Sequence, residues 1–333
     1  MKAKKVSNKK ADIKCIAVFT SGGDSPGMNA CIRAVVRTGI NYGLEVYGIL
    51  RGYQGMVDGE FVFMNASSVA NIIHRGGTIL KTARSKDFMT KAGMLRAKEN
   101  LEKYSIDGVV AIGGDGTFHG ALDFSKICSV PFIGCPGTID NDLVGTDFAI
   151  GYDTAINTVV DAVDKIRDTA ESHGRVFFVE VMGRDAGLIA LRSGIASGAE
   201  AILIPETPTR LNDLINHLVK GRKDKTSKII ITAEGDEAGG AFEIAEKVKK
   251  TIPSLDVRVT ILGHIQRGGN PSAMDRVYAS RMGFASVEAL LHGKKGVMTG
   301  IVNKQIAFTP FSKAVKHIQR PDEAMLRMID ILA

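Results

Sequence analysis

The chain has 333 residues, of which 44% are hydrophobic and 37 are glycine, and this length suffices for two domains with separate cores. Its formal net charge is +7, but six lysines against Asp12 place +5 within the first fourteen residues. We interpret residues 1–14 as a basic flexible tail. The nearly neutral remainder disfavours a protein that binds nucleic acid or a membrane through a large basic surface.

The cysteines and the apolar runs indicate the compartment. The four cysteines lie in or beside apolar stretches, without CxxC pairing or metal-type spacing, so we expect buried free thiols. Free thiols are typical of a reducing cytosol. No signal-type segment follows the basic N-terminus, and no apolar run reaches the roughly 18–20 residues that span a bilayer. We therefore expect a soluble, cytoplasmic protein.

Short β-branched runs alternate with longer helical patterns along the chain. The predicted strands are Ile16–Thr20, Glu45–Leu50, Gly108–Ile112, Phe132–Cys135, Val176–Val181, Ala201–Ile204, Ile229–Ala233, Arg258–Leu262 and Gly300–Asn303. The predicted helices are Met28–Tyr42, Lys91–Lys103, Asp153–Ser172, Asp185–Ser197, Leu211–Arg222, Ala241–Lys250 and Asp275–Leu291, with a last helix at the C-terminus. This alternation predicts an α/β protein with two Rossmann-like three-layer domains, whose sheets are mostly parallel and carry helices on both faces.

A domain boundary is expected near Ile150–Tyr152, where glycine-rich turns give way to a long helical pattern. The first domain then covers residues 15–150 together with roughly residues 264–310, and the second covers residues 151–263 and the C-terminal helix. Because ligands of parallel sheets bind at the carboxyl ends of the strands, motifs that follow strands could share one crevice.

The first motif is the stretch Thr20–Asn29, TSGGDSPGMN, which leads from a strand into a helix. Its adjacent glycines allow a phosphate to approach main-chain N–H groups, and the helix N-terminus adds a favourable dipole. The spacing fits neither the P-loop nor GxGxxG, and an ordinary strand-to-helix turn is the alternative interpretation.

Two further motifs follow apolar runs, namely Gly113–Thr117 (GGDGT) and Pro136–Asp142 (PGTIDND). An Asp in a phosphate-binding turn can contact a metal ion, and a second Asp can accept a proton from a substrate hydroxyl. Phosphoryl transfer to an alcohol needs these components, so the sequence predicts a kinase for a small molecule. The GGDG string by itself indicates only nucleotide phosphates, because NAD kinases and diacylglycerol-type lipid kinases carry it too.

These three motifs, then Met182-Gly183-Arg184 and Gly263–Gly269 (GHIQRGG), occur in an order that closely resembles the bacterial 6-phosphofructokinases. The resemblance runs from about Ile16 to the last helix. It implies ATP-dependent phosphorylation of D-fructose 6-phosphate at the C1 hydroxyl to fructose 1,6-bisphosphate, the committed step of glycolysis. The first domain would bind ATP and Mg²⁺, and the second would bind fructose 6-phosphate.

The resemblance also implies roles for individual residues. Asp140 would be the general base, Thr138 would contact the transferring group, and Arg184 would stabilise the developing charge. The implied ATP contacts are Gly23, Arg84, Ser85, Gly114, Asp115, Gly116 and Thr117, with Asp115 also contacting Mg²⁺. The implied substrate contacts are Thr138, Ile139, Asp140, Arg175, Met182, Gly183, Arg184, Glu234, Arg258, His264, Ile265, Gln266 and Arg267.

Some of these residues imply an assembly. In the family, Arg175 and Arg258 reach across from an adjacent subunit, so we expect a homo-oligomer, usually a tetramer, with shared active sites.

Other residues of the set are implied to bind particular groups of the substrate. His264 and Arg267 suit the 6-phosphate, and Glu234 would bind a sugar hydroxyl. Asp142 would point to the same side as Asp140 if the segment is extended, and would then organise metal-bound water or neighbouring charge.

The phosphoryl donor is predicted from two glycines. Relatives that use pyrophosphate typically carry Asp at Gly116 and Lys at Gly137, and without those side chains adenosine has room to bind. ATP is therefore expected, with a pyrophosphate-dependent phosphofructokinase as one alternative. An NAD or lipid kinase is disfavoured by PGTIDND and GHIQRGG. A non-catalytic nucleotide sensor is disfavoured because Asp115, Asp140 and Arg184 are all present.

An effector site for ADP or phosphoenolpyruvate is matched only in part. The matching residues are Arg33, Ala34, Val35, Val36, Arg37, Arg167, Gly198, Ala199 and Glu200. However, Ala66 replaces an arginine that is usual in the family and Asn71 an aspartate, while residues Lys223–Lys228 retain cations. Loss of one cationic side chain removes a contact worth about 1.5–3 kcal/mol. Regulation is expected to be weakened, altered in effector, or absent.

Overall fold

The computed structural model describes residues 12–220, 227–315 and 320–332, and within them the chain forms two compact units. Unit 1 contains residues up to Thr138, the segment Leu143–Gly151 and residues from Asn270 to 315, and unit 2 contains Ile139–Asp142, Tyr152–Gly269 and the C-terminal helix. Most of the basic tail, the end of the predicted helix Leu211–Arg222 and residues 223–226 lie outside the described residues.

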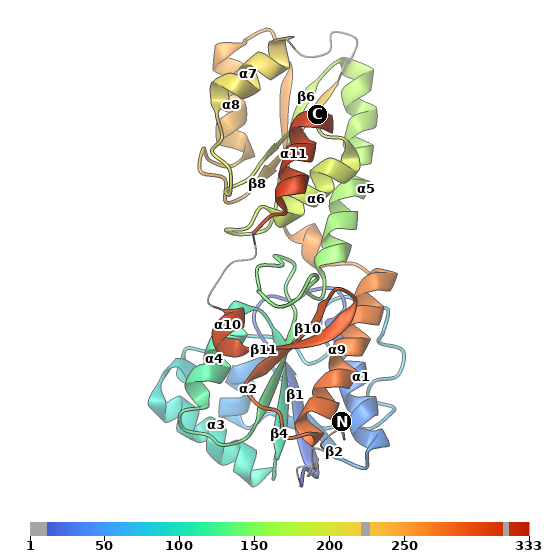
Figure 1. Ribbon diagram of the computed structural model, residues 1–333, viewed down its shortest axis with the longest axis vertical. Coiled ribbons are helices and arrows are strands. Elements are labelled where there is room, and N and C mark those ends of the chain that lie inside the picture. Colours follow the sequence, from blue (N-terminus) through green and yellow to red (C-terminus); the bar gives the residue numbers. More distant parts are fainter. Residues whose placement is uncertain (1–11, 221–226, 316–319, 333) are drawn as a thin grey trace, which may run out of the picture. The chain divides into compact units, whose positions relative to one another are not determined.

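Among the described residues, unit 1 contains a seven-stranded sheet in the order β11-β10-β5-β4-β1-β2-β3 (Figure 1). Its strands are β1 (Cys15–Thr20), β2 (Glu45–Ile49), β3 (Phe61–Phe63), β4 (Gly108–Gly113), β5 (Phe132–Pro136), β10 (Val297–Val302) and β11 (Gln305–Pro310). The five strands from β10 to β2 pair in parallel. The edge strands β3 and β11 pair antiparallel to their neighbours.

Helices cover both faces of this sheet. They are α1 (Met28–Asn41), α2 (Gly52–Asp58), η1 (Asp87–Met89), α3 (Lys91–Lys103), α4 (Asp115–Phe124), α9 (Ala273–Leu291) and α10 (Phe311–Ala314). Helices α1 and α9 pack against each other on one face, and α2, α3 and α4 lie on the other (Figure 1).

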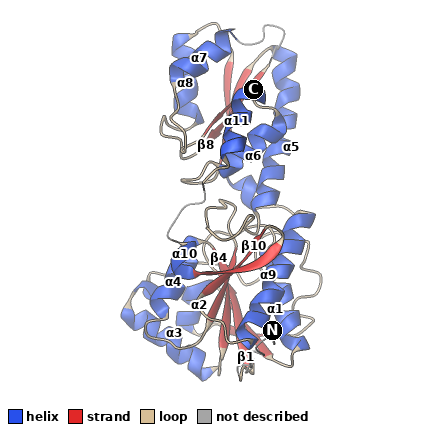
Figure 2. Ribbon diagram, viewed as in Figure 1, coloured by secondary structure: helices blue, strands red, loops and turns tan. Residues whose placement is uncertain are grey.

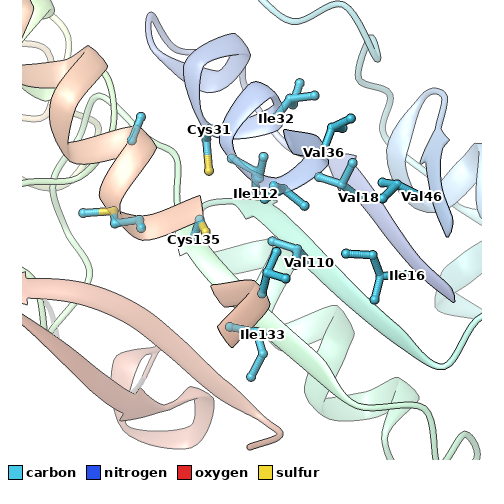
Figure 3. Packing of buried hydrophobic residues seen from close by; sticks show 14 of the residues in the cluster. Ile16, Val18, Cys31, Ile32, Val36, Val46, Val110, Ile112, Ile133 and Cys135 are labelled. Carbon is cyan, nitrogen blue, oxygen red and sulfur yellow. The ribbon is translucent and has the colours of Figure 1, made fainter. Parts of the chain in front are cut away.

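The continuous apolar run of β1 explains this three-layer arrangement. Successive side chains of a strand point to opposite faces, so a strand buried on both sides needs no polar alternation. Ile16 and Val18 accordingly pack with α1, as Figure 3 shows, whereas Ala17 and Phe19 belong to the core on the opposite face. The strand is therefore central, with a hydrophobic core on each side.

Unit 2 is built in the same way around a smaller sheet. Its described strands, all parallel and in the order β7-β8-β6-β9, are β6 (Val176–Val181), β7 (Ala201–Leu203), β8 (Lys228–Ala233) and β9 (Val257–Ile261). Its helices are α5 (Tyr152–His173), α6 (Leu188–Ser197), α7 (Leu211–Lys220), α8 (Ala241–Thr251), η2 (Gly263–Arg267) and α11 (Glu323–Leu332). Helices α5 and α6 pack together, as do α7 and α8, and Figure 2 shows the strands between helices.

These units confirm the predicted α/β class with mostly parallel sheets and helices on both faces. Several elements differ from the prediction. Helices α2, α4 and α10 and the antiparallel edge strands β3 and β11 have no counterpart among the predicted elements. In α4, Gly116 and Gly120 weaken the helical pattern, but a side chain at Gly120 would lie 2.9 Å from the ring of Tyr53, so close packing favours glycine. No helix in the described part of the chain is both long and apolar enough to cross a bilayer.

Candidate functional site

The glycine-rich turns of unit 1 lie where the connections of two neighbouring strands diverge. Strand β1 leads into α1 on one face, and β4 leads into α4 on the other. The strands are paired in parallel, with Thr20 opposite Ile112, so both turns leave the same edge of the sheet. Such a divergence creates a crevice beyond the carboxyl ends of the strands, which is the usual ligand site of an open α/β sheet.

Close packing joins the two turns. The Thr117 hydroxyl donates to the carbonyl oxygen of Ser21 at 3.3 Å, and the Tyr53 hydroxyl donates to the carbonyl oxygen of Thr117 at 2.6 Å. A Cβ at Gly113 would lie 2.2 Å from the Thr117 hydroxyl oxygen and 2.5 Å from the Ser21 carbonyl oxygen. Residue 113 must therefore be glycine, and the buried Thr117 side chain connects α4 to the first turn.

Asp115 is the first residue of α4, where a carboxylate interacts favourably with the helix dipole. Its side chain is 39% exposed, and one of its oxygens lies 3.2 Å from Nδ1 of His119, one helical turn later. Sequence reasoning missed His119, although its i, i+4 spacing from Asp115 would have indicated the pairing had the helix been predicted. The neighbouring Gly116 is exposed, and a Cβ there would meet no described atom within 4 Å.

The donor set at Asp115 fits Mg²⁺. This ion is usually bound by one or two carboxylates, several waters and the phosphate oxygens of a nucleotide. Nowhere in the described ranges do three or more His, Cys, Asp or Glu side chains gather into a metal site. An exposed carboxylate beside a glycine-rich turn therefore suits an ion that arrives with its phosphate ligands.

The predicted ATP residues Arg84 and Ser85 lie on a segment that is held against the first turn. The Thr82 hydroxyl donates to the carbonyl oxygen of Gly22 at 2.6 Å. Ser85 donates to Gln54 at 2.8 Å and accepts a bond from the N–H of Phe88 at 3.0 Å. Ser85 is therefore engaged in local structure, whereas Arg84 is exposed.

The PGTIDND loop leaves the same edge of the sheet. Gly113 and Pro136 are paired, and the N–H of Gly137 donates to the carbonyl oxygen of Gly113 at 2.9 Å. A Cβ on Gly114 would lie 3.5 Å from the Cβ of Thr138. The backbone hydrogen bond from Gly137 to Gly113 therefore joins the GGDG turn to the start of the PGTIDND loop, and a side chain at position 114 would reach Thr138.

The loop then departs from the extended conformation that the sequence suggested. Asn141 has φ +53°, in the left-handed region, so the alternation of side chains is broken between Asp140 and Asp142. Asp140 and Asp142 were expected to point to the same side only if the segment between them is extended. That condition is not met, so the expectation does not apply. Asp140 is buried and Asp142 is partly buried.

Unit 2 also has a divergence point, between β6 and β8. Strand β6 continues to α6 and β8 to α8, on opposite faces. Glu234, which follows β8, accepts bonds through one carboxylate oxygen from the N–H groups of Gly183 at 3.3 Å and Arg184 at 2.8 Å. Arg184 has φ +54°, which is unfavourable for a non-glycine residue, and these bonds hold its backbone in place. The Arg184 side chain is exposed at this edge.

The GHIQR segment forms η2 beside the same edge. Gln266 is fully buried, accepts a bond from the N–H of Met182 at 3.2 Å and donates to the carbonyl oxygen of Gly263 at 3.0 Å. Its side chain therefore connects the two loops. His264 and Ile265 are exposed and Arg267 is partly exposed, so these side chains are accessible to a ligand.

The helix N-termini at this edge are occupied by carboxylates of the protein itself. Glu206 accepts a bond from the N–H of Gly187, which precedes α6, at 2.8 Å. Glu180 accepts one from the N–H of Ala241, the first residue of α8, at 2.8 Å. A sugar phosphate at this edge would therefore depend on cationic side chains more than on helix dipoles.

Arg175 and Arg258 lie at the other end of the sheet. Arg175 precedes β6, and Arg258 is the second residue of β9, opposite Phe177. Asp256, which sequence reasoning missed, accepts from Arg175 at 2.8 Å and lies 3.0 Å from Arg258, and the hydrogen bond from Arg175 is the main reason that the pKa of Asp256 is lowered. The six residues of β6 span about 20 Å, so Arg175 and Arg184 of one chain cannot contact the same small ligand.

The predicted effector residues differ in accessibility. Arg37 is exposed and Arg33 partly exposed on α1, while Val35 and Val36 are fully buried in the core of unit 1. Ala34 is partly exposed, and its Cβ would lie 3.0 Å from a Cβ on Gly283. The side chains of Val35 and Val36 are therefore unavailable to a ligand.

The remaining effector residues lie in unit 2 or in an exposed loop. Arg167 donates to the carbonyl oxygens of Ser197 and Gly198, where it caps the C-terminus of α6. Ala199 is buried, and the buried Glu200 carboxylate accepts a bond from the N–H of Ile229. Ala66 and Asn71, the two departures from the family pattern, are exposed.

Comparison with known proteins places this geometry in a family. The model of the family described as phosphofructokinase matches residues 15–290. The chain is 55% identical to the ATP-dependent 6-phosphofructokinase of Cytophaga hutchinsonii over 96% of this chain and 98% of that protein. It is 56% identical to ATP-dependent 6-phosphofructokinase 2 of Bacteroides thetaiotaomicron over 92% of this chain and 94% of that protein.

Solved structures agree with these matches. Phosphofructokinase from Saccharomyces cerevisiae superposes with a TM-score of 0.86 at 37% identity, over 91% of this chain and 45% of the yeast chain. The fold is shared by a pyrophosphate-dependent phosphofructokinase from Marinobacter aquaeolei, with a TM-score of 0.83 at 24% identity over 93% of this chain and 86% of that chain. From its motifs, its fold and its relatives, the chain belongs to the phosphofructokinase family.

Proposed function

We propose that this chain catalyses the ATP-dependent phosphorylation of fructose 6-phosphate at its C1 hydroxyl, which yields fructose 1,6-bisphosphate. The relatives that match nearly the whole chain are named ATP-dependent 6-phosphofructokinases. The observation that carries the proposal is the hydrogen bond from the N–H of Gly137 to the carbonyl oxygen of Gly113, because it joins the glycine-rich turn to the loop that contains Asp140. The glycine-rich turn and the start of the loop with the proposed base therefore leave the same edge of the sheet in unit 1.

The first unit is assigned the nucleotide. The turn at Gly22 and Gly23 and the N-terminus of α4 offer main-chain N–H groups to phosphate oxygens. Exposed Arg84 adds a cation beside the first turn. Asp115 would hold Mg²⁺, which when bound neutralises charge on the phosphate oxygens. This unit would therefore align the γ-phosphate and lower its charge.

Residues of the PGTIDND loop and of unit 2 are assigned the chemistry of the acceptor. Asp140 accepts the proton of the C1 hydroxyl as that oxygen attacks the γ-phosphorus, and the bond from phosphorus to the β,γ-bridging oxygen breaks. The Thr138 hydroxyl and the Arg184 guanidinium donate to the transferring phosphoryl group. ADP leaves, and no covalent enzyme intermediate is needed.

The second unit is assigned the sugar phosphate. Arg267 and His264 bind the 6-phosphate, and the Glu234 carboxylate accepts a bond from a sugar hydroxyl through the oxygen that does not hold the Arg184 loop. Met182, Gly183 and Ile265 line this site, while buried Gln266 fixes its shape.

Arg175 and Arg258 are assigned to the site of a neighbouring subunit. Their shared partner Asp256 holds them as a pair about one strand length from Arg184, which supports a homo-oligomer, usually a tetramer in this family, with shared active sites. A mixing experiment tests this. Asp140→Asn and Arg258→Ala are each expected to be nearly inactive, and subunit exchange should restore activity because some sites receive an intact set. Mixtures no more active than their components would exclude sharing.

The activity itself is tested by steady-state assays with ATP or pyrophosphate as donor and fructose 6-phosphate as acceptor in the presence of Mg²⁺. We expect turnover with ATP and little with pyrophosphate, because an exposed Gly116 leaves room for a nucleotide. The reverse donor preference, or phosphorylation of NAD in place of the sugar phosphate, would overturn the proposal.

We infer an altered effector response at the site suggested by Arg33 and Arg37. The cation usual at position 66 is replaced by Ala66, and Arg167 is already engaged with the C-terminus of α6. Titration of activity with ADP and phosphoenolpyruvate at subsaturating fructose 6-phosphate measures this. A flat response to both would exclude an effector role for these residues.

We place the enzyme in the cytoplasm because its thiols are free and buried.

A further inference from the structure

Asp275 lies where three segments of unit 1 meet. Its carboxylate accepts a 2.8 Å hydrogen bond from the N–H of Gly151, in a buried position. Its own N–H donates at 3.1 Å to the hydroxyl of Ser272, which caps α9. A charged acceptor makes a strong bond, and its removal would leave a buried N–H unsatisfied. Asp275 is therefore a firm anchor for the backbone at Gly151.

Gly151 ends the loop that began at β5 and contains Thr138 and Asp140. The loop closes on itself through a parallel bridge between Gly137 and Ile150, with the N–H of Ile150 donating to the Pro136 carbonyl oxygen at 2.8 Å. The hydrogen bond from Gly151 to Asp275 lies one residue beyond this bridge. It therefore holds in place the segment in which the loop ends.

Asp275 also lies beside the end of the first glycine-rich turn. A Cβ on Gly27 would lie 3.5 Å from the Cβ of Asp275, and a Cβ on Gly151 would lie 2.5 Å from the Cβ of Ser25. Both glycines have φ near +100°, where a side chain would be strained as well as crowded. The glycine-rich turn of residues 21–27 and the end of the 137–151 loop are consequently close together beside Asp275.

We propose that Asp275 is a positioning residue for phosphoryl transfer, which holds the base of the 137–151 loop against the glycine-rich turn of residues 21–27. The inference rests on the proposed kinase activity, because it concerns the alignment of Thr138 and Asp140 with the donor. Asp275 acts through Gly151 and does not touch a substrate. A small misplacement of reacting groups can cost about 100-fold in rate, so its loss should lower kcat more than it changes substrate binding.

The test compares Asp275→Ala and Asp275→Asn with Ser272→Ala as a matched control. Asp275→Ala is expected to lower kcat by about 10- to 100-fold while each KM changes by less than about threefold. Asp275→Asn keeps an oxygen acceptor in place and should recover most of the lost kcat. Ser272→Ala weakens the same turn of α9 and lowers the melting temperature, yet its kcat should stay within about twofold of the parent.

Hydrogen exchange at the Gly151 amide gives a second readout that does not need activity. Exchange should accelerate in Asp275→Ala and stay slow in Ser272→Ala and Asp275→Asn. If Asp275→Ala fails to fold, Asp275→Glu, which displaces the carboxylate, should still lower kcat without a matching change in KM. Unchanged Gly151 exchange, or equal losses of kcat in Asp275→Ala and Ser272→Ala, would refute the anchor. An inactive parent protein would instead refute the proposed function and leave the exchange result to decide the anchor.

Discussion

The carboxylate of Glu234 accepts a 2.8 Å hydrogen bond from the backbone N–H of Arg184, and through it the loop after β8 fixes the loop after β6. Arg184 has a left-handed backbone, and its exposed guanidinium is assigned to the transferring phosphoryl group. The Glu234 side chain thus fixes the backbone of Arg184, whose own side chain carries the positive charge.

Glu234→Gln tests this relationship. The amide can keep one acceptor bond but loses its charge, and Glu234→Ala loses the bond. We expect Glu234→Ala to raise the KM for fructose 6-phosphate by about tenfold or more, since a hydrogen bond to a charged group is worth about 1.5–3 kcal/mol. The KM for ATP should hardly change, and Glu234→Gln should lie between Glu234→Ala and the parent. An equal rise in both KM values would show a general loss of structure.

Asp140→Asn removes the proposed base while it keeps the size of the side chain. General-base catalysis typically contributes about 10²- to 10⁴-fold, so kcat should fall by that range while both KM values stay similar. Stopped-time assays of product, with Asp142→Asn as the neighbouring control, measure the effect. If Asp140→Asn turned over at the parental rate, Asp140 would not be the base.

The donor preference is tested at two glycines with different surroundings. A Cβ at Gly116 would meet no described atom within 4 Å, so the Gly116→Asp variant should remain stable while its KM for ATP rises. Gly137→Lys is crowded, because a Cβ there lies 3.0 Å from Cε of Met28 and 3.1 Å from Cγ2 of Ile112. We therefore expect Gly137→Lys to lower the melting temperature as well. Calorimetry together with ATP and pyrophosphate titrations separates the two effects, and a stable Gly137→Lys protein would contradict the packing argument.

The cysteines should be unreactive in the folded protein. All four are buried and free, and burial raises the pKa of Cys15 to about 11 and that of Cys31 well above its usual range. Because the thiolate is the nucleophile, a thiol reagent should label the native protein slowly at pH 8 and the denatured protein at four sites.

The same raised pKa values link stability to pH. A buried thiol such as that of Cys15 stays protonated in the folded state at a pH where it ionises in the unfolded state. Its contribution to stability is therefore complete below the unfolded pKa, near 9, and is lost as pH rises toward the folded pKa, about 11. Cys15→Ser should therefore reduce the loss of melting temperature between pH 9 and pH 11. An unchanged slope in this variant would argue against a contribution from Cys15.

Local patterns in the sequence account for the α/β class, because buried parallel strands need continuous apolar runs such as Cys15–Thr20 and helices need a different period. The candidate site residues come from the resemblance of its motifs to the bacterial 6-phosphofructokinases, and they remain predictions. The predicted helix Lys91–Lys103 has the same bounds in the structure, where the Thr90 side chain caps its N-terminus. These signals are all local in the chain.

Which residues contact one another depends on long-range packing. Helix α4 forms despite its glycines because Gly120 packs closely against Tyr53, and Arg175 is separated from Arg184 because they lie at opposite ends of one strand. The pairs Glu234–Arg184 and Asp275–Gly151 join positions 50 and 124 residues apart. Contacts of that kind depend on how the strands are ordered in the sheet and on which face each helix covers, and no local pattern in the sequence records that order.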